Sequence, residues 1–181
     1  MQHYENAAIV VELVRQLRAR DSWCGATHLQ KTSYFLKHLT GVPLDFDFIL
    51  YKHGPFSFDL QDEVAYLTAY DLLDLKSNGP RYGASLVEGG RAELLRKEYG
   101  YKAEEYQPQI RFVANRLASK GVVDLEKLGT ALWVTENTEA ETPEARAREM
   151  IACKPHIDFA DALAAVNELD EMRAAWAAQN N

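Results

Sequence analysis

Residues 27–75 read THLQKTSYFLKHLTGVPLDFDFILYKHGPFSFDLQDEVAYLTAYDLLDL, and the order of the patterns within them decides the fold. Leu29, Leu36 and Leu39 recur at helical spacing, which predicts an amphipathic helix that begins at residue 27. Gly41 follows where helices commonly end in a left-handed residue. The first element of the stretch is therefore a helix that stops just before Gly41.

A strand and a second helix are predicted next. Residues 46–51 alternate between two faces, as side chains do along a strand. Gly54 and Pro55 favour a sharp bend directly after this strand, and we assign them as structural corner residues. Ser57 can then cap a helix over residues 58–70 by accepting a hydrogen bond from an amide of its first turn.

A two-stranded ribbon completes the pattern. Residues 72–76 and 81–87 are predicted as short strands, and the turn residues at 77–80 separate them. Helices followed by a strand, a helix and a ribbon are typical of a winged helix, in which the ribbon is the wing. An isolated ribbon is marginally stable in water, so we expect the wing to lean on the helices.

The remainder of the chain is predicted to be helical. A first amphipathic helix is expected over residues 5–20, and Thr142 with Pro143 is a typical helix start in the C-terminal half. The predicted fold is α+β and mainly α. Residues 1–99 would form a winged-helix-like core, and residues 100–181 a helical C-terminal extension that packs on it as one compact domain.

The composition is that of a folded, soluble protein. Hydrophobic residues make up 47% and charged residues 26% of the 181 positions. No stretch approaches the ~20 apolar residues that span a bilayer, and two cysteines cannot form a disulfide framework. We expect a cytoplasmic protein that does not enter a membrane.

The formal net charge of -7 argues against nucleic acid as the partner. Residues 134–181 hold ten Asp or Glu against four Lys or Arg, and residues 58–70 hold acidic side chains without a basic one. Such surfaces repel phosphate groups. The alternative of a winged-helix DNA-binding regulator depends on side chains predicted to face outward from the helix before Gly41 and from the wing. These are Lys31, Tyr34, Lys37, His38, Lys76 and Arg81.

A third hypothesis is an enzyme. His53 could act as an acid or base near neutral pH, in a pocket closed by Tyr51 and Lys31. The sequence contains no Gly-x-Ser-x-Gly turn and no phosphate-binding loop. Because the corner more simply connects two elements, we assign no catalytic residue.

Two Cys–His pairs have ligand types that zinc uses. The pairs are Cys24-x3-His28 and Cys153-x2-His156, and they could supply four ligands. They lie far apart in the sequence, and neither is a Cys-x2-Cys half-site. We therefore predict no metal site and no cofactor.

Two segments carry a resemblance to a known family. They are Leu29-Gln30-Lys31 with Tyr34-Phe35, and the corner Tyr51-Lys52-His53-Gly54-Pro55-Phe56-Ser57. Through these segments, and through Lys154-Pro155-His156, the chain resembles the YwgA-like uncharacterised bacterial proteins. It is more distantly similar to the phage-associated Panacea-domain (SocA-like) antitoxins. The resemblance implies a winged-helix-like core and, for the Panacea relatives, a protein that binds a toxin or acts as an adaptor.

The leading hypothesis is a non-catalytic bacterial interaction protein. Its role would be antitoxin-like, or that of an adaptor or regulator in a toxin–antitoxin, phage-related or stress system, and its partner would be another protein. The resemblance carries over three positions as surface or pocket residues, and the basic helix and wing add three more. The assigned binding residues are Lys31, Tyr34, Lys37, Tyr51, His53 and Arg81.

Overall fold

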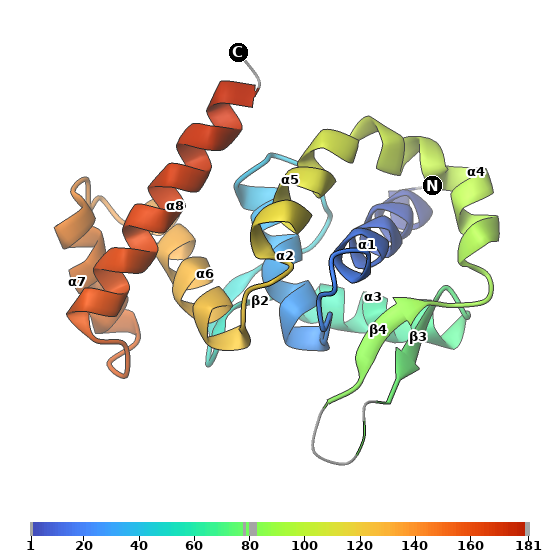
Figure 1. Cartoon of the computed structure of the whole chain (residues 1–181), viewed down its shortest axis with the longest axis horizontal. Helices are drawn as coiled ribbons and strands as arrows, with labels where there is room; N and C mark the ends of the chain where they lie inside the picture. Colours follow the sequence, from blue (N-terminus) through green and yellow to red (C-terminus); the bar gives the residue numbers. More distant parts are fainter. Residues whose placement is uncertain (1, 78, 80–82, 180–181) are drawn as a thin grey trace.

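The computed structural model describes residues 2–77, 79 and 83–179 (Figure 1). Its helices are α1 (Gln2–Arg18), α2 (Ala26–His38), α3 (Phe58–Ala69), α4 (Ala92–Glu105), α5 (Gln107–Leu117), α6 (Val122–Asn137), α7 (Pro143–Cys153) and α8 (Phe159–Gln179). Its strands pair as two antiparallel hairpins, β1 (Ile49–Tyr51) with β2 (Gly54–Phe56) and β3 (Leu73–Lys76) with β4 (Ser85–Glu88). This confirms a mainly helical α+β fold. Within the described ranges, no helix combines the length and the apolar character needed to cross a membrane.

Helix α1 is the centre of the core. It packs against α4, α5 and strand β4, and its side chains Leu13, Val14 and Leu17 are fully buried. Helix α2 packs against α5 and α6. Burial of each large aliphatic side chain contributes roughly 1.5–3 kcal/mol relative to exposure, so these helix contacts supply much of the stability.

The core extends past the predicted boundary between residues 99 and 100. Helix α4 runs through Gly100 without a break, so that boundary falls inside a helix. Because α4 and α5 both cover α1, the core needs residues from both sides of it. The C-terminal helices α6, α7 and α8 pack on one another, and α6 joins them to α2 and β2. Figure 1 shows the end of α8 projecting beyond its neighbours.

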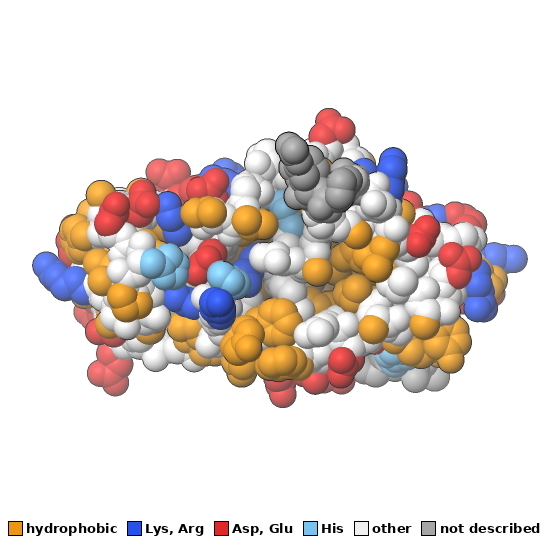
Figure 2. All heavy atoms as spheres, turned by 90° about the horizontal axis from the view of Figure 1, so that it is seen from below, with side chains coloured by type: hydrophobic (Ala, Val, Ile, Leu, Met, Phe, Trp, Pro, Cys, Tyr) orange, Lys and Arg blue, Asp and Glu red, His pale blue; other side chains and the backbone are white. Residues whose placement is uncertain are grey.

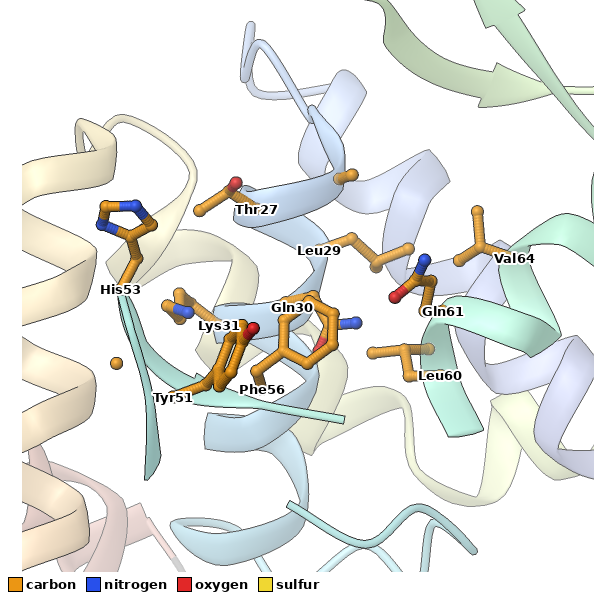
Figure 3. A pocket seen from close by; sticks show the side chains of 12 residues that line it. Thr27, Leu29, Gln30, Lys31, Tyr51, His53, Phe56, Leu60, Gln61 and Val64 are labelled. Carbon is orange, nitrogen blue, oxygen red and sulfur yellow. The ribbon is translucent and has the colours of Figure 1, made fainter. Parts of the chain in front are cut away.

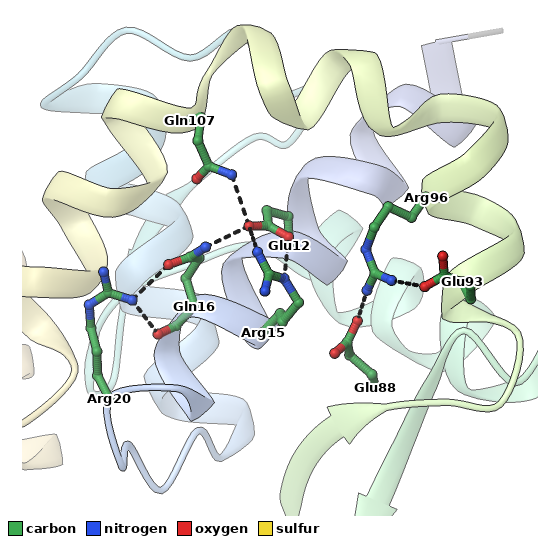
Figure 4. A network of polar contacts seen from close by, with 8 residues as sticks. All are labelled: Glu12, Arg15, Gln16, Arg20, Glu88, Glu93, Arg96 and Gln107. Atoms are coloured by element: carbon green, nitrogen blue, oxygen red, sulfur yellow. Dashed lines mark hydrogen bonds and ion pairs between the residues drawn. The ribbon is translucent and has the colours of Figure 1, made fainter.

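A buried carboxylate links α1 to α5 (Figure 4). Glu12 Oε1 accepts hydrogen bonds from Gln16 Nε2 at 2.7 Å and from Gln107 Nε2 at 3.0 Å. Arg15 donates to both oxygens of the same carboxylate. Burial raises the pKa of Glu12, but the hydrogen bonds from Arg15, Gln107 and Gln16 outweigh burial and hold this pKa below its ordinary value. The ionised carboxylate is therefore part of the folded structure at neutral pH.

Three helix-end signals in the sequence are confirmed. The Ser57 hydroxyl accepts a hydrogen bond from Leu60 N and caps α3, and the Thr142 hydroxyl caps α7 in the same way. Gly41 follows α2 with a φ of +76°, in the left-handed region that favours glycine. Each signal depends only on residues within one turn, which is why the sequence reveals it.

Strands β1 and β2 form a tight hairpin where the sequence predicted one strand and a bend. Tyr51 pairs with Gly54, so Lys52 and His53 are the two-residue turn. Gly54 has a φ of +85° and begins the returning strand, and Pro55 lies inside it. The prediction that Gly54 and Pro55 form the corner is therefore wrong by two residues, although the chain does reverse here.

The β3–β4 hairpin is the predicted ribbon. Leu73 pairs with Glu88 at one end, and the backbone of Leu86 donates to the carbonyl oxygen of Cys24 at 2.8 Å. Strand β4 also packs on α1, so the ribbon leans on the helices as expected. Arg81, predicted as a binding residue of this ribbon, lies outside the described residues.

Candidate functional site

The helix face predicted to present basic residues is buried. Lys31 is 2% exposed and Tyr34 is inaccessible to solvent, and α6 is packed on the same helix. Tyr34 donates from its hydroxyl to Glu136 Oε2 at 3.0 Å, a contact inside the fold. The prediction that Lys31 and Tyr34 face outward is therefore wrong.

The other basic side chains of α2 also serve the fold. Lys37 is partly buried, and its Nζ donates to the carbonyl oxygen of Phe46 at 2.7 Å. His38 Nδ1 lies 3.0 Å from Glu136 Oε2. Helix α2 therefore lacks the outward row of cations that neutralises phosphates in DNA-binding helices.

Two buried lysines hold the β1–β2 hairpin. Lys31 donates from Nζ to the carbonyl oxygen of Pro55 at 2.7 Å. Lys154, which follows α7, donates from Nζ to the carbonyl oxygens of Tyr51 and Lys52, the latter at 2.6 Å. The residue Pro55 is buried, and a buried carbonyl needs such a donor because it has lost its hydrogen bonds to water. We call this arrangement the lysine clamp, and it ties the hairpin to α2 and to the segment after α7.

Sequence reasoning missed the part that Lys154 plays in the clamp. In the sequence, Lys154 is marked only by the family resemblance, because its partner Tyr51 stands 103 positions earlier in the chain. Its neighbours Pro155 and His156 mark a helix end and give no sign of a distant contact. Only the packing of the C-terminal helices brings Lys154 to the hairpin.

Glu126 of α6 is the acidic member of this cluster. Its Oε2 lies 3.6 Å from His53 Nδ1, and its Oε1 lies 3.2 Å from His156 Nε2. Burial lowers the pKa of Lys31 to about 8; the charge of Glu126 opposes this lowering and that of Lys154 adds to it. The cluster thus places two buried ammonium groups near a single carboxylate.

A cavity of about 350 Å³ opens between α2, the β1–β2 hairpin and α3 (Figure 3). Leu29, Phe56 and Leu60 give it apolar walls. Figure 3 shows Lys31 and the turn residue His53 toward one end of it. Small-molecule sites are typically mostly apolar and roughly 300–1,000 Å³ in volume, so this cavity has a suitable size and lining.

An exposed aromatic cluster borders the cavity. The ring centroids of Tyr51, Phe56 and Phe58 lie between 5.1 and 5.9 Å from one another. Tyr51 is 52% exposed and Phe58 is 53% exposed. Figure 2 shows hydrophobic side chains gathered near the middle of one face, beside histidine side chains and side chains of Lys or Arg. We call Tyr51, Phe56 and Phe58 the aromatic patch.

The two histidines of the Cys–His pairs make other contacts, and the two cysteines are free. Cys24 is buried, and burial raises the pKa of its thiol to about 12. His28 Nε2 donates to the carbonyl oxygen of Leu117 at 3.0 Å, while His156 faces Glu126. Among the described residues, no group of three or more His, Cys, Asp or Glu side chains is placed to hold a metal ion.

Comparison with known proteins adds no relative. The chain matches no model of a protein family and no curated protein sequence. The resemblance to YwgA-like proteins therefore stays a prediction. Function is therefore inferred from the lysine clamp, the cavity and the aromatic patch.

Proposed function

We propose that this chain is a non-catalytic interaction protein that binds a partner protein through the aromatic patch. The observation that supports it is the exposure of about half of Tyr51 and of Phe58, although their rings pack on a shared neighbour, Phe56. Aromatic side chains often dominate binding energy, since they bury a large area at a low entropy cost. The lysine clamp fixes the hairpin before a partner arrives, which reduces the cost of ordering it on binding.

The resemblance to YwgA-like and Panacea-domain proteins supports an antitoxin-like or adaptor role. In this proposal the partner is a toxin or another protein of a bacterial stress or phage-related system, in the cytoplasm. Helix α3 places the exposed Asp59 and Asp62 just after Phe58. An acidic rim beside an apolar patch favours a partner that carries basic residues around its own apolar contact.

The two alternatives have less support. DNA binding needs outward cations, whereas Lys31 is buried and Lys37 is bound to a backbone carbonyl. Catalysis by His53 needs a fixed imidazole, but this side chain is 67% exposed and lies 3.6 Å from Glu126, beyond good hydrogen-bond distance.

The test is affinity capture from a nuclease-treated lysate of the source cell, followed by direct binding to the recovered protein. Replacing Tyr51 and Phe58 by serine should weaken that binding by at least about tenfold, because both patch rings lose their contact area. Val123→Ser is the matched control, since Val123 is 61% exposed and lies on α6, outside the patch. Equal binding by the patch variant and wild type contradicts the proposal, as does recovery of nucleic acid alone from an untreated lysate.

A further inference from the structure

Lys31 brings a buried cation to the wall of a mostly apolar cavity, which Gln30, Gln61 and His53 also line. Its Nζ carries three protons when charged, and Pro55 O accepts one of them. Within the described residues, no carboxylate lies within ion-pair distance of this nitrogen. Buried charges in proteins are normally paired, so the Lys31 ammonium has capacity for an anion.

The neighbouring charges leave this capacity open. Glu126 is the nearby carboxylate: its oxygens lie 3.6 Å from His53 and 3.2 Å from His156, its Oε1 accepts no hydrogen bond among the described residues, and its charge offsets only part of the effect of burial on Lys31. Lys154 is a second buried cation, and it is bound to hairpin carbonyls rather than to an acid. An anionic group placed against Lys31 would therefore relieve repulsion between the two ammonium groups.

We propose that this cavity binds a small organic acid, with its carboxylate on Lys31 and its apolar body between α2, β2 and α3. The walls that would receive the body are Leu29, Phe56, Leu60 and Val64. A volume of about 350 Å³ suits a whole small ligand. One lysine suits a single carboxylate, whereas the polyphosphate of a nucleotide needs several donors. This inference goes beyond the proposed function and is tested without a partner protein.

The protonation of Lys31 gives the proposal a pH signature. Burial lowers the pKa of Lys31 to about 8, and a bound carboxylate should raise it again. The groups around it are Glu126 from α6, Lys154 after α7, and His53 and Tyr51 from the hairpin. Binding of the acid should weaken above about pH 8, because Lys31 is then mostly neutral in the free protein. The carboxylate must then bind either without a counter-charge or together with a proton taken up by Lys31.

The test uses 3-phenylpropionate and its neutral analogue 3-phenylpropionamide as probes of the same shape. Each is titrated into the purified protein at about pH 7, and shifts of backbone amide NMR signals are followed. Wild type should bind the acid at least about tenfold more tightly than the amide, with the shifts centred on residues around Lys31 and Phe56. Lys31→Met should remove this preference. Lys37→Met, which changes a lysine of the same helix that binds Phe46 O, should keep it.

A second arm needs no variant. In wild type the preference for the acid should fall by at least about tenfold between pH 7 and pH 9.5, while amide binding stays constant. Equal affinity for acid and amide at pH 7 overturns the proposal, and so does the absence of shifts around the cavity at about 20 mM probe. Neither outcome bears on partner binding by the aromatic patch, because the titration contains no partner protein. Failure of this proposal can therefore be distinguished from failure of the proposed function.

Discussion

Lys31 holds an ammonium group where only 2% of the residue meets solvent. Burial lowers its pKa from 10.5 to about 8, so the unfolded chain binds this proton more tightly than the folded protein does. The free energy of unfolding should therefore rise with pH across the window between these two values. We predict that the rise contributed by Lys31 is about 3 kcal/mol.

The measurement compares urea unfolding of wild type and Lys31→Met at about pH 7.5 and about pH 10. Methionine has a similar length and no charge, so the variant should lack the rise with pH. In the variant, Pro55 O lacks its donor at both pH values. This cost cancels when the difference in unfolding free energy between wild type and variant at one pH is compared with the difference at the other. An identical pH slope in both proteins would show that Lys31 is hydrated in solution.

Glu63 is, like Lys31, a buried ionisable group whose hydrogen bonding is incomplete. Its Oε1 has no hydrogen-bond partner among the described residues, and its Oε2 lies 3.1 Å from His3 Nδ1. Burial raises the pKa of Glu63 from 4.5 to about 7, so the folded protein binds this proton more tightly than the unfolded chain. The resulting stability is complete below pH 4.5 and is lost as the pH rises through about 7.

Replacement of Glu63 by glutamine removes the charge and keeps the shape. We predict that Glu63→Gln raises the free energy of unfolding by about 1–3 kcal/mol at pH 8 and changes it little near pH 5. Chemical unfolding at the two pH values measures both numbers. If the variant is less stable at pH 8, the contact between His3 and the ionised carboxylate outweighs its burial.

At the scale of elements, β2 packs tightly against α6 at Gly129. A Cβ at Gly129 would lie 3.0 Å from Cδ of Pro55 and 3.8 Å from Cδ of Lys31. The rigid proline ring cannot turn aside, so the hairpin would have to move away from α6. We predict that Gly129→Ala lowers the free energy of unfolding by about 1–3 kcal/mol, although alanine favours helix by up to about 1 kcal/mol.

Gly100 provides the matched control, because it also lies inside a helix. A Cβ there would meet only the flexible side chain of Arg96, at 3.3 Å. Gly100→Ala should therefore leave stability unchanged or raise it by up to about 1 kcal/mol. Similar unfolding midpoints for the two alanine variants would contradict the close packing of β2 on α6.

The sequence predicts elements well where their signals are local. The cap at Ser57, the left-handed Gly41 and the cap at Thr142 each act within one turn, and all three are present. The sequence does not predict the β1–β2 hairpin correctly, because its signals are not local. Alternating side chains at residues 46–48 resemble a strand, but the carbonyl of Phe46 is bound by Lys37 and the ladder begins only later. The side chain of Lys37 thus takes the place of a strand partner at Phe46. This contact joins two different elements, so the local sequence pattern does not predict it.

At the scale of the whole molecule, packing buries two residues that the sequence predicts to lie on the surface. Lys31 and Tyr34 look like surface residues on a helical wheel, since one is charged and the other carries a hydroxyl. Packing of α6 on α2 places both inside, and Lys31 lines the cavity from this buried position. The cluster predicted from Lys31, Tyr51 and His53 does come together at the cavity. Its remaining charged members are Glu126 in α6 and Lys154 just after α7, and sequence patterns do not connect either segment to the hairpin.

The same packing predicts how the chain folds as a unit. A fragment of residues 1–99 lacks the end of α4 and all of α5, so the buried side of α1 around Leu13 and Leu17 loses its cover. It also lacks α6, and with it the surface on which β2 packs. We predict that this fragment lacks the near-ultraviolet circular dichroism of fixed aromatic packing and gives the narrow amide NMR dispersion of an unfolded or molten chain, unlike the full chain under the same conditions. Native-like dispersion from the fragment would mean that the N-terminal elements form a domain alone, and that the α1–α5 contact adds stability without being needed for folding.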